Sequence, residues 1–218
     1  MSDALQSPVA TFFLGLLSGW LLIEVTEWRR VRSNRRELRR ALIAELETTE
    51  VLVSIMVTKY ARYFTAEPDV HFVAQEFRWY TTVGRKRLSA VGLQSHLGTS
   101  PSVVETATDA DVVKVLSLLH ETIGNTVVVP VLESVLNGGT GGFASRQIQA
   151  LGMVRWQCFL LEQDVEWMKS LYNLSFTVTD ETNHGNVLQD HQRRSESYAQ
   201  RSRTLLSVVR AALAALRV

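Results

Sequence analysis

The chain opens on an apolar segment and continues in a series of amphipathic ones. Residues 8–23 hold sixteen consecutive side chains without an ionisable group. From Leu38 onward, apolar side chains recur every three, four or seven residues, which is the period of a helix with one buried face. No proline or glycine interrupts residues 20–67. The pattern predicts an apolar N-terminal helix that runs directly into a long helix ending before Pro68.

The rest of the chain also has helical periodicity. A helix is expected within residues 69–92 with breaks at its two glycines, and Asp109 or Asp111 is expected to cap the next one. The β-branched run before Pro130 is interpreted as a kinked or restarted helix ending near Leu136, because no second strand is evident to pair with it. The two strongest helices are predicted at 144–172 and 186–216. The sequence therefore predicts an all-α fold, a helical bundle with short connections.

The first 28 residues are predicted to form a membrane anchor. Sixteen residues of helix span about 24 Å, which is short of a hydrocarbon core of about 30 Å. Extension to Trp28 gives enough length and places Glu24 at the polar interface, with Trp20 and Trp28 as an aromatic belt. A buried N-terminal helix of a soluble bundle is the alternative. A cleaved signal peptide is excluded, because no basic residue precedes the run and no small-residue cleavage site follows it.

Positive charge lies just after this run and orients the predicted anchor. Residues 29–40 carry a charge of +6, and the remainder of the chain sums to −5. The positive-inside rule then places the N-terminus outside and the domain after residue 28 in the cytoplasm. The arginines are expected to contact lipid headgroups; a solvated face is the alternative, and a nucleic-acid patch is disfavoured because base-stacking aromatics are not interleaved. These arginines are Arg29, Arg30, Arg32, Arg35, Arg36, Arg39 and Arg40.

Gly15 and Gly19 form a G-x-x-x-G pair within the predicted anchor. Small residues one turn apart let two membrane helices approach closely, so the pair indicates self-association. Glu24 lies about 180° around the helix from Gly15, outside such a seam. We therefore expect a homo-oligomer with Glu24 at headgroup level.

Catalytic patterns are nearly absent. None of the five histidines lies in an H-E-x-x-H motif, and the glycine-rich residues 137–142 lack the lysine of a phosphate-binding loop. Cys158 falls on the apolar stripe of a predicted helix, and the trio Glu162, Asp164 and Glu166 is interpreted as its solvated face. No cofactor or metal is expected, and an enzyme is disfavoured. A tethered, metal-dependent enzyme using the acidic and histidine residues at 180–191 is the alternative.

The apolar segment, the arginines, Glu45 and Glu47, and the aromatic Phe77 and Trp79 resemble short bacterial proteins with one N-terminal anchor and a cytoplasmic helical domain. Some of those resemble effectors or accessory subunits of antiphage systems. The resemblance implies a bacterial inner-membrane interaction or effector protein with a cytoplasmic protein partner. The chain is thus divided into an anchor (1–28), a basic juxtamembrane helix (29–67) and a cytoplasmic bundle (68–218) that packs with residues 38–67.

Overall fold

The computed structural model describes residues 8–64, 66–90, 107–118, 124–138, 142–178 and 180–217, and for 8–23, 25, 28 and 90 it describes the backbone alone. All regular elements in these ranges are helical, which confirms the predicted all-α class. The first helix, α1 (Pro8–Lys59), has 52 residues. The chain divides into two units, residues 1–42 and 43–218.

Among the described residues, no helix combines the length and the apolarity that crossing a bilayer requires. The apolar run at 8–23, with Gly15, Gly19 and Trp20, lies outside the residues whose side chains are described, and so does the side chain of Trp28.

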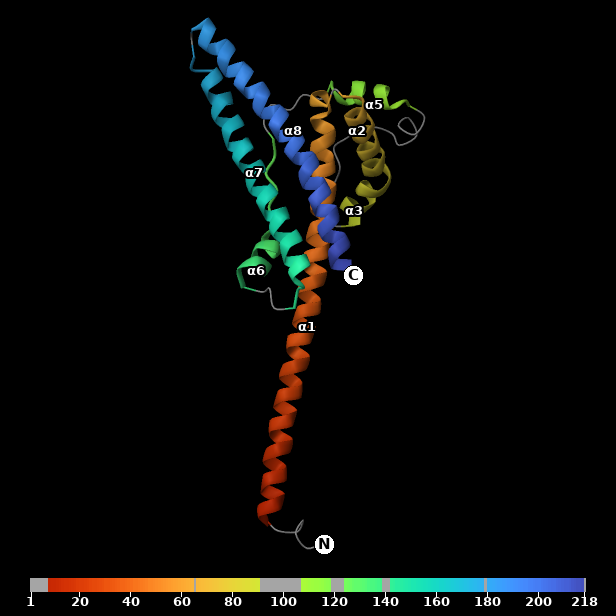
Figure 1. The fold of residues 1–218 in the computed structure, drawn as a ribbon, viewed down its shortest axis with the longest axis vertical. Helices are drawn as coiled ribbons and strands as arrows, with labels where there is room; N and C mark the ends of the chain where they lie inside the picture. Colours follow the sequence, from red (N-terminus) through yellow and green to blue (C-terminus); the bar gives the residue numbers. More distant parts are fainter. Residues whose placement is uncertain are drawn as a thin grey trace. The chain divides into compact units, whose positions relative to one another are not determined.

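Two long helices, α7 (Ser145–Ser175) and α8 (Glu181–Arg217), pack side by side as an antiparallel hairpin (Figure 1). Gln147 links the N-terminal end of α7 to the C-terminal end of α8. Its side-chain oxygen accepts from the backbone N–H of Ala144, and its amide donates to the carbonyl of Ala215 at 2.9 Å. The start predicted for α8 is wrong: the helix begins at Glu181 rather than near residue 186, and it includes His184 and Gly185.

A second group of helices follows α1. The 3-10 turn η2 (Ala61–Tyr63) leads to α2 (Glu67–Trp79), the π-helical turn η3 (Tyr80–Gly84), α3 (Arg85–Ala90) and, later, α5 (Asp109–Leu116) beside α2 (Figure 1). Pro68 lies in the first turn of α2, where its missing N–H leaves no hydrogen bond unmade. The break predicted at Gly84 is instead a π turn that continues the helical path.

The structure corrects two predicted helix boundaries. The helix α1 ends at Lys59, several residues before Pro68, and Tyr60 packs its buried ring at 4.8 Å from that of Tyr198. Thr108 caps α5 in place of the aspartates, because its hydroxyl oxygen accepts from the backbone N–H of Asp111. The sequence pattern also predicts a loop at 95–102 and a continuation of this helix to residue 123. The helix ends at Leu116 instead, and residues 95–102 and 119–123 lie outside the described residues.

The helix α6 (Pro130–Gly138) is capped by a distant side chain. Both carboxylate oxygens of Glu45 accept backbone N–H bonds at 2.8 Å, from Val131 and from Leu132. A carboxylate at a helix N-terminus satisfies orphan donors and complements the helix dipole. The restarted helix predicted at Pro130 is confirmed, while residues 124–129 before it have no regular structure.

Buried charges join α1, α2, α3 and α8. The Arg210 guanidinium donates to Glu50 at 2.8 Å and to both oxygens of Glu76 at 2.6 and 2.8 Å, and Arg87 donates to Glu50 at 2.8 Å. Both guanidinium groups lie over the ring of Trp79. Burial acts to lower the pKa of Arg210, but the hydrogen bonds to Glu76 and Glu50 outweigh it and raise that pKa. Four helices are therefore held in register by one ionic cluster.

Candidate functional site

The helix α7 carries one apolar seam against the rest of its unit. Its buried apolar side chains recur at intervals of three and four residues, as in a coiled-coil core. They are Leu151, Val154, Cys158, Leu161, Val165, Met168 and Leu171. The prediction of this core helix and its stripe is confirmed.

A second stripe runs along the opposite side of α7, with the same spacing. We name it the outer stripe, and its members are Met153, Trp156, Leu160, Gln163, Trp167, Ser170 and Leu174. Trp156 is 53% exposed and Trp167 is 52% exposed, while Met153 and Leu174 are 46% and 45% exposed. Leu160 is half-buried, and Gln163 and Ser170 are polar members of the stripe. Exposed large apolar side chains that gather on one face mark interaction surfaces, and tryptophan dominates the binding energy of many of them.

Neighbouring side chains hold this surface in shape. Phe159 stacks on Trp156 with ring centroids 5.6 Å apart, and the guanidinium of Arg194 lies 5.0 Å from the centre of the Trp167 ring. Rings fixed by such contacts lose little conformational freedom on binding. The outer stripe is therefore preorganised for a partner.

Asp164 corrects the interpretation of the acidic trio as a solvated face. Glu162 and Glu166 are exposed, but Asp164 is fully buried, with Arg201 at 3.2 Å and Arg194 at 3.6 Å from its oxygens. Burial raises the pKa of Asp164, and the two arginines offset part of that increase. The residue fastens α7 to α8 rather than forming part of the exposed face.

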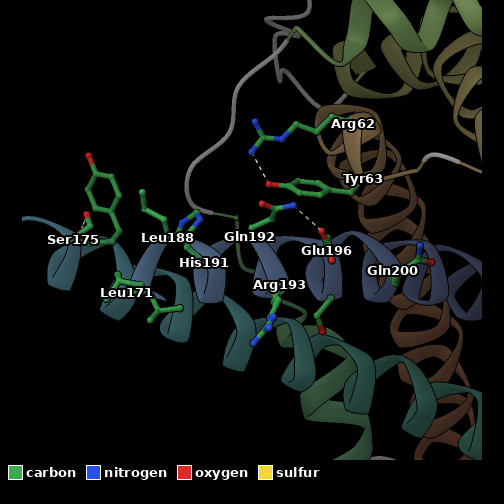
Figure 2. Close-up of a pocket in the computed structure, with 13 residues that line it drawn as sticks. Arg62, Tyr63, Leu171, Ser175, Leu188, His191, Gln192, Arg193, Glu196 and Gln200 are labelled. Atoms are coloured by element: carbon green, nitrogen blue, oxygen red, sulfur yellow. Dashed lines mark hydrogen bonds between the residues drawn. The ribbon is translucent and has the colours of Figure 1, made fainter. Parts of the chain in front are cut away.

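A cleft of about 1010 Å³ opens beside the hairpin. Figure 2 shows Arg62 and Tyr63 on one side of it and Leu188, His191 and Gln192 on the α8 side. Arg62 donates to the Tyr63 hydroxyl at 2.5 Å. The His191 Nε2 atom is buried and has no hydrogen-bond partner among the described residues. The lining suits binding of a mixed polar and apolar group, and it includes no cysteine.

Groups capable of catalysis or metal binding do not converge. Among the described residues, no three His, Cys, Asp or Glu side chains are close enough to hold a metal ion, those at 180–191 included. Burial raises the pKa of the Cys158 thiol to about 12, so the thiolate nucleophile is not formed near neutral pH. His71 and Arg78 bind Asp109, each at 2.5 Å, and lower the pKa of that carboxyl, with His71 the larger cause. His71 is exposed and the other two are half-buried, and together the three side chains join α2 to α5.

The predicted interfacial and basic residues lie along α1. Glu24 is exposed, and so are the arginines except Arg39, which is half-buried. Because α1 is helical throughout this segment, six of the seven arginines fall within an arc of about 140°. The arginines therefore form a stripe along one face of α1 rather than a ring around it. That face comprises Arg29, Arg32, Arg35, Arg36, Arg39 and Arg40.

The outer stripe was not predicted from the sequence, because the spacing of apolar residues was assigned to only one face of this helix, the buried seam. The signal was present: four residues of α7 exactly one heptad apart are all large and apolar, at 153, 160, 167 and 174. A helix with two such rows is apolar on opposite sides, which a single surface helix does not need.

The chain matches no protein-family model, no curated protein and no solved structure with which it was compared.

Proposed function

We propose that this chain is a membrane-anchored, non-enzymatic interaction protein of the bacterial inner membrane, which binds a protein partner through the outer stripe of α7. The observation that carries the proposal is the half exposure of Trp156 and Trp167 in a regular apolar row. Two tryptophan side chains that stay half exposed to water do not stabilise a folded domain. In a binding surface, the same side chains supply the strongest contacts with the partner.

The anchor is supported by the sequence of residues 8–28 and by the helix that contains them. The backbone from Pro8 onward is one α-helix, the form in which a lone segment satisfies its own hydrogen bonds in lipid. Trp20, Trp28 and Glu24 suit its interfacial end, and Gly15 with Gly19 suits self-association there. The N-terminus is then outside and the helical domain is cytoplasmic.

The distance of each arginine along α1 determines how strongly it is attracted to the lipid headgroups. From Arg29 to Arg40 the helix rises about 17 Å, while the attraction of anionic headgroups falls off within about 8–10 Å. In a helix that stands along the membrane normal, Arg29, Arg30 and Arg32 therefore contribute most to orientation. Arg39 and Arg40 contribute least.

The tethered enzyme receives no support from the described residues. The acidic and histidine residues at 180–191 form no metal-binding cluster there, and the buried Cys158 is chemically inert. No observation favours a second function. The role in antiphage defence that the resemblance implies stays a prediction.

Fractionation of expressing cells tests the anchor. The full chain is expected in the membrane fraction and resistant to carbonate extraction, and deletion of residues 1–28 is expected to release it. Replacing Arg29, Arg30 and Arg32 with glutamine should disturb orientation, read by a topology reporter at the C-terminus, more than the same change at Arg36, Arg39 and Arg40. A full chain recovered in the soluble fraction would refute the anchor.

Sedimentation of the full chain, extracted from its native membrane in mild detergent, tests the interaction. An assembly larger than a monomer is expected, and the double change Trp156→Ser and Trp167→Ser should weaken it, leaving only the association between the anchors. The matched control is Glu162→Ser, an exposed residue of α7 outside the outer stripe. An assembly equally stable in all three chains would contradict a role for this surface.

A further inference from the structure

We infer that the occupant of the outer stripe is a second copy of this chain, with the two α7 helices parallel and in register. The inference rests on the proposed function and names the partner of that same surface. It depends on the spacing, the polarity and the exposed area of the stripe.

The spacing selects a helix as the partner. The outer stripe keeps alternating intervals of three and four residues from Met153 to Leu174, which is three heptads. Only a helix that follows α7 along its length stays in contact with a 3.5-residue repeat over that distance. Among the side chains that the structure describes, which exclude residues 8–23, 25 and 28 of α1, those of large apolar residues exposed on the other long helices are Leu188 on α8 and Val31 and Leu52 on α1. If two copies of this chain pair, the helix best suited to contact α7 of one copy is therefore α7 of the other.

The two polar members of the stripe select the orientation. In a parallel, in-register pair each residue meets its own copy, so Gln163 meets Gln163 and the amides hydrogen-bond to each other, as Ser170 does with Ser170. In an antiparallel pair the layers mix, and Gln163 faces Leu160 or Trp167 while Ser170 faces Met153 or Leu160. Such a pair would bury amide and hydroxyl groups against apolar surface without partners, which is unfavourable. Matching polar with polar residues favours the parallel pair.

The exposed area is sufficient for a specific contact. Trp156 and Trp167 are about half exposed, Phe159 beside them is 39% exposed, and Met153 and Leu174 are nearly half exposed. With side chains of about 150–250 Å² each, these five offer roughly 500 Å² per copy. If all of this area were covered, two copies would bury at most about 1,000 Å², the lower limit for a biological interface.

A cysteine placed on the stripe tests the inference in the full chain, in membranes of expressing cells. Ser170→Cys puts a thiol on the exposed face, and the native Cys158 is buried with a pKa raised to about 12, so it does not compete. A mild oxidant is expected to convert Ser170→Cys into a disulfide-linked dimer at least about tenfold more than it converts the control. The control is Lys169→Cys, the adjacent exposed position about 100° around the helix.

A second measurement separates this inference from the proposed function. Labelling of Ser170→Cys by a membrane-permeant maleimide reports whether the stripe is covered. A shielded thiol with a homodimer disulfide supports both proposals. A shielded thiol without that disulfide means that either an antiparallel copy or another protein covers the stripe, which overturns the parallel pair and leaves the proposed function standing. A thiol as reactive as the Lys169→Cys control overturns both.

The antiparallel pair has its own signature. Its two registers separate the two copies of residue 170 by about 26 Å or about 15 Å, and they bring residue 170 near residue 153 or near residue 160 of the other copy. A disulfide between Ser170→Cys and Leu160→Cys chains is therefore tested beside the pair with Met153→Cys. A disulfide that forms only when the two chains of one of these pairs are expressed together would overturn the parallel arrangement.

Discussion

The ionic cluster around Arg210 allows the sharpest test of what holds the helical domain together. The change is Arg210→Met, which keeps the apolar stem over Trp79 and removes three charge-assisted hydrogen bonds of 2.6–2.8 Å. It leaves two carboxylates in the interior, because the side chains of Glu50 and Glu76 are only 9% and 6% exposed. After the substitution, Glu50 still accepts a hydrogen bond from Arg87. For Glu76, the remaining hydrogen bond among the described residues is the one from the hydroxyl of Ser54 at 3.4 Å.

The expected loss in the free energy of unfolding follows from these contacts. Removing one partner of a buried ion pair costs about 3–5 kcal/mol. The Arg210 side chain is 35% exposed, so water reaches the vacated site and the lower end, about 3 kcal/mol, applies. That is a large part of a total stability of about 5–15 kcal/mol. With a urea slope of about 2 kcal/mol per molar, the unfolding midpoint should fall by about 1.5 M.

Urea unfolding of the full chain in detergent micelles, followed by far-ultraviolet circular dichroism, measures this shift. Arg193→Met is the matched control, because Arg193 lies on the same helix with 66% exposure and pairs with Asp190 at 3.4 Å. It should cost less than about 0.5 kcal/mol. Adding Glu76→Met to Arg210→Met removes the stranded carboxylate and should restore most of the loss. A midpoint unchanged by Arg210→Met, or a double variant no better than the single one, would refute the reasoning.

Four further outcomes are expected from the same unfolding measurement or from hydrogen exchange. Glu45→Gln should weaken the cap of α6 by about 1–2 kcal/mol, seen as faster amide exchange in α6 alone. Gly124→Ala should destabilise the domain by more than about 1 kcal/mol, since its Cβ would lie 2.5 Å from the buried Tyr198 ring. Asp109 has a lowered pKa, so its contribution is present above its ordinary pKa of 3.8 and is lost as pH falls below it; Asp109→Asn should remove that acid-dependent loss. Asp164 has a raised pKa, so the wild-type chain should lose stability relative to Asp164→Asn as pH rises from 3.8, and parallel pH profiles would contradict this.

The spacing of apolar residues correctly predicted the features of the fold that local sequence determines. The buried seam of α7 and the restart of a helix at Pro130 follow from spacing and from the geometry of proline. The end of α1 does not, because no residue between Lys59 and Pro68 interrupts a helix by itself. The chain turns there while Tyr60 packs on Tyr198, a contact between residues far apart in sequence.

Charged residues were misjudged for the same reason. In the sequence, Asp164 lies between two other acidic residues and resembles part of an exposed face. The packing of α8 places two arginines beside it, and no local pattern indicates that contact. The partners of Arg210 lie 134 and 160 residues away. Pairs at such separations leave no trace in a hydrophobic pattern, whereas the outer stripe of α7 is local and could have been found by counting heptads on both sides of the helix.

The cap that Glu45 provides has a consequence for how the domain opens. With nine residues, α6 is shorter than the about 12–15 that an isolated helix needs in water, and its N-terminal donors rely on a side chain 86 residues earlier in the chain. Closing so long a loop is slow, so α6 should be among the last elements to form and the first to melt. Limited proteolysis would then cut there under native conditions, and the cleaved α7 and α8 hairpin would stay folded.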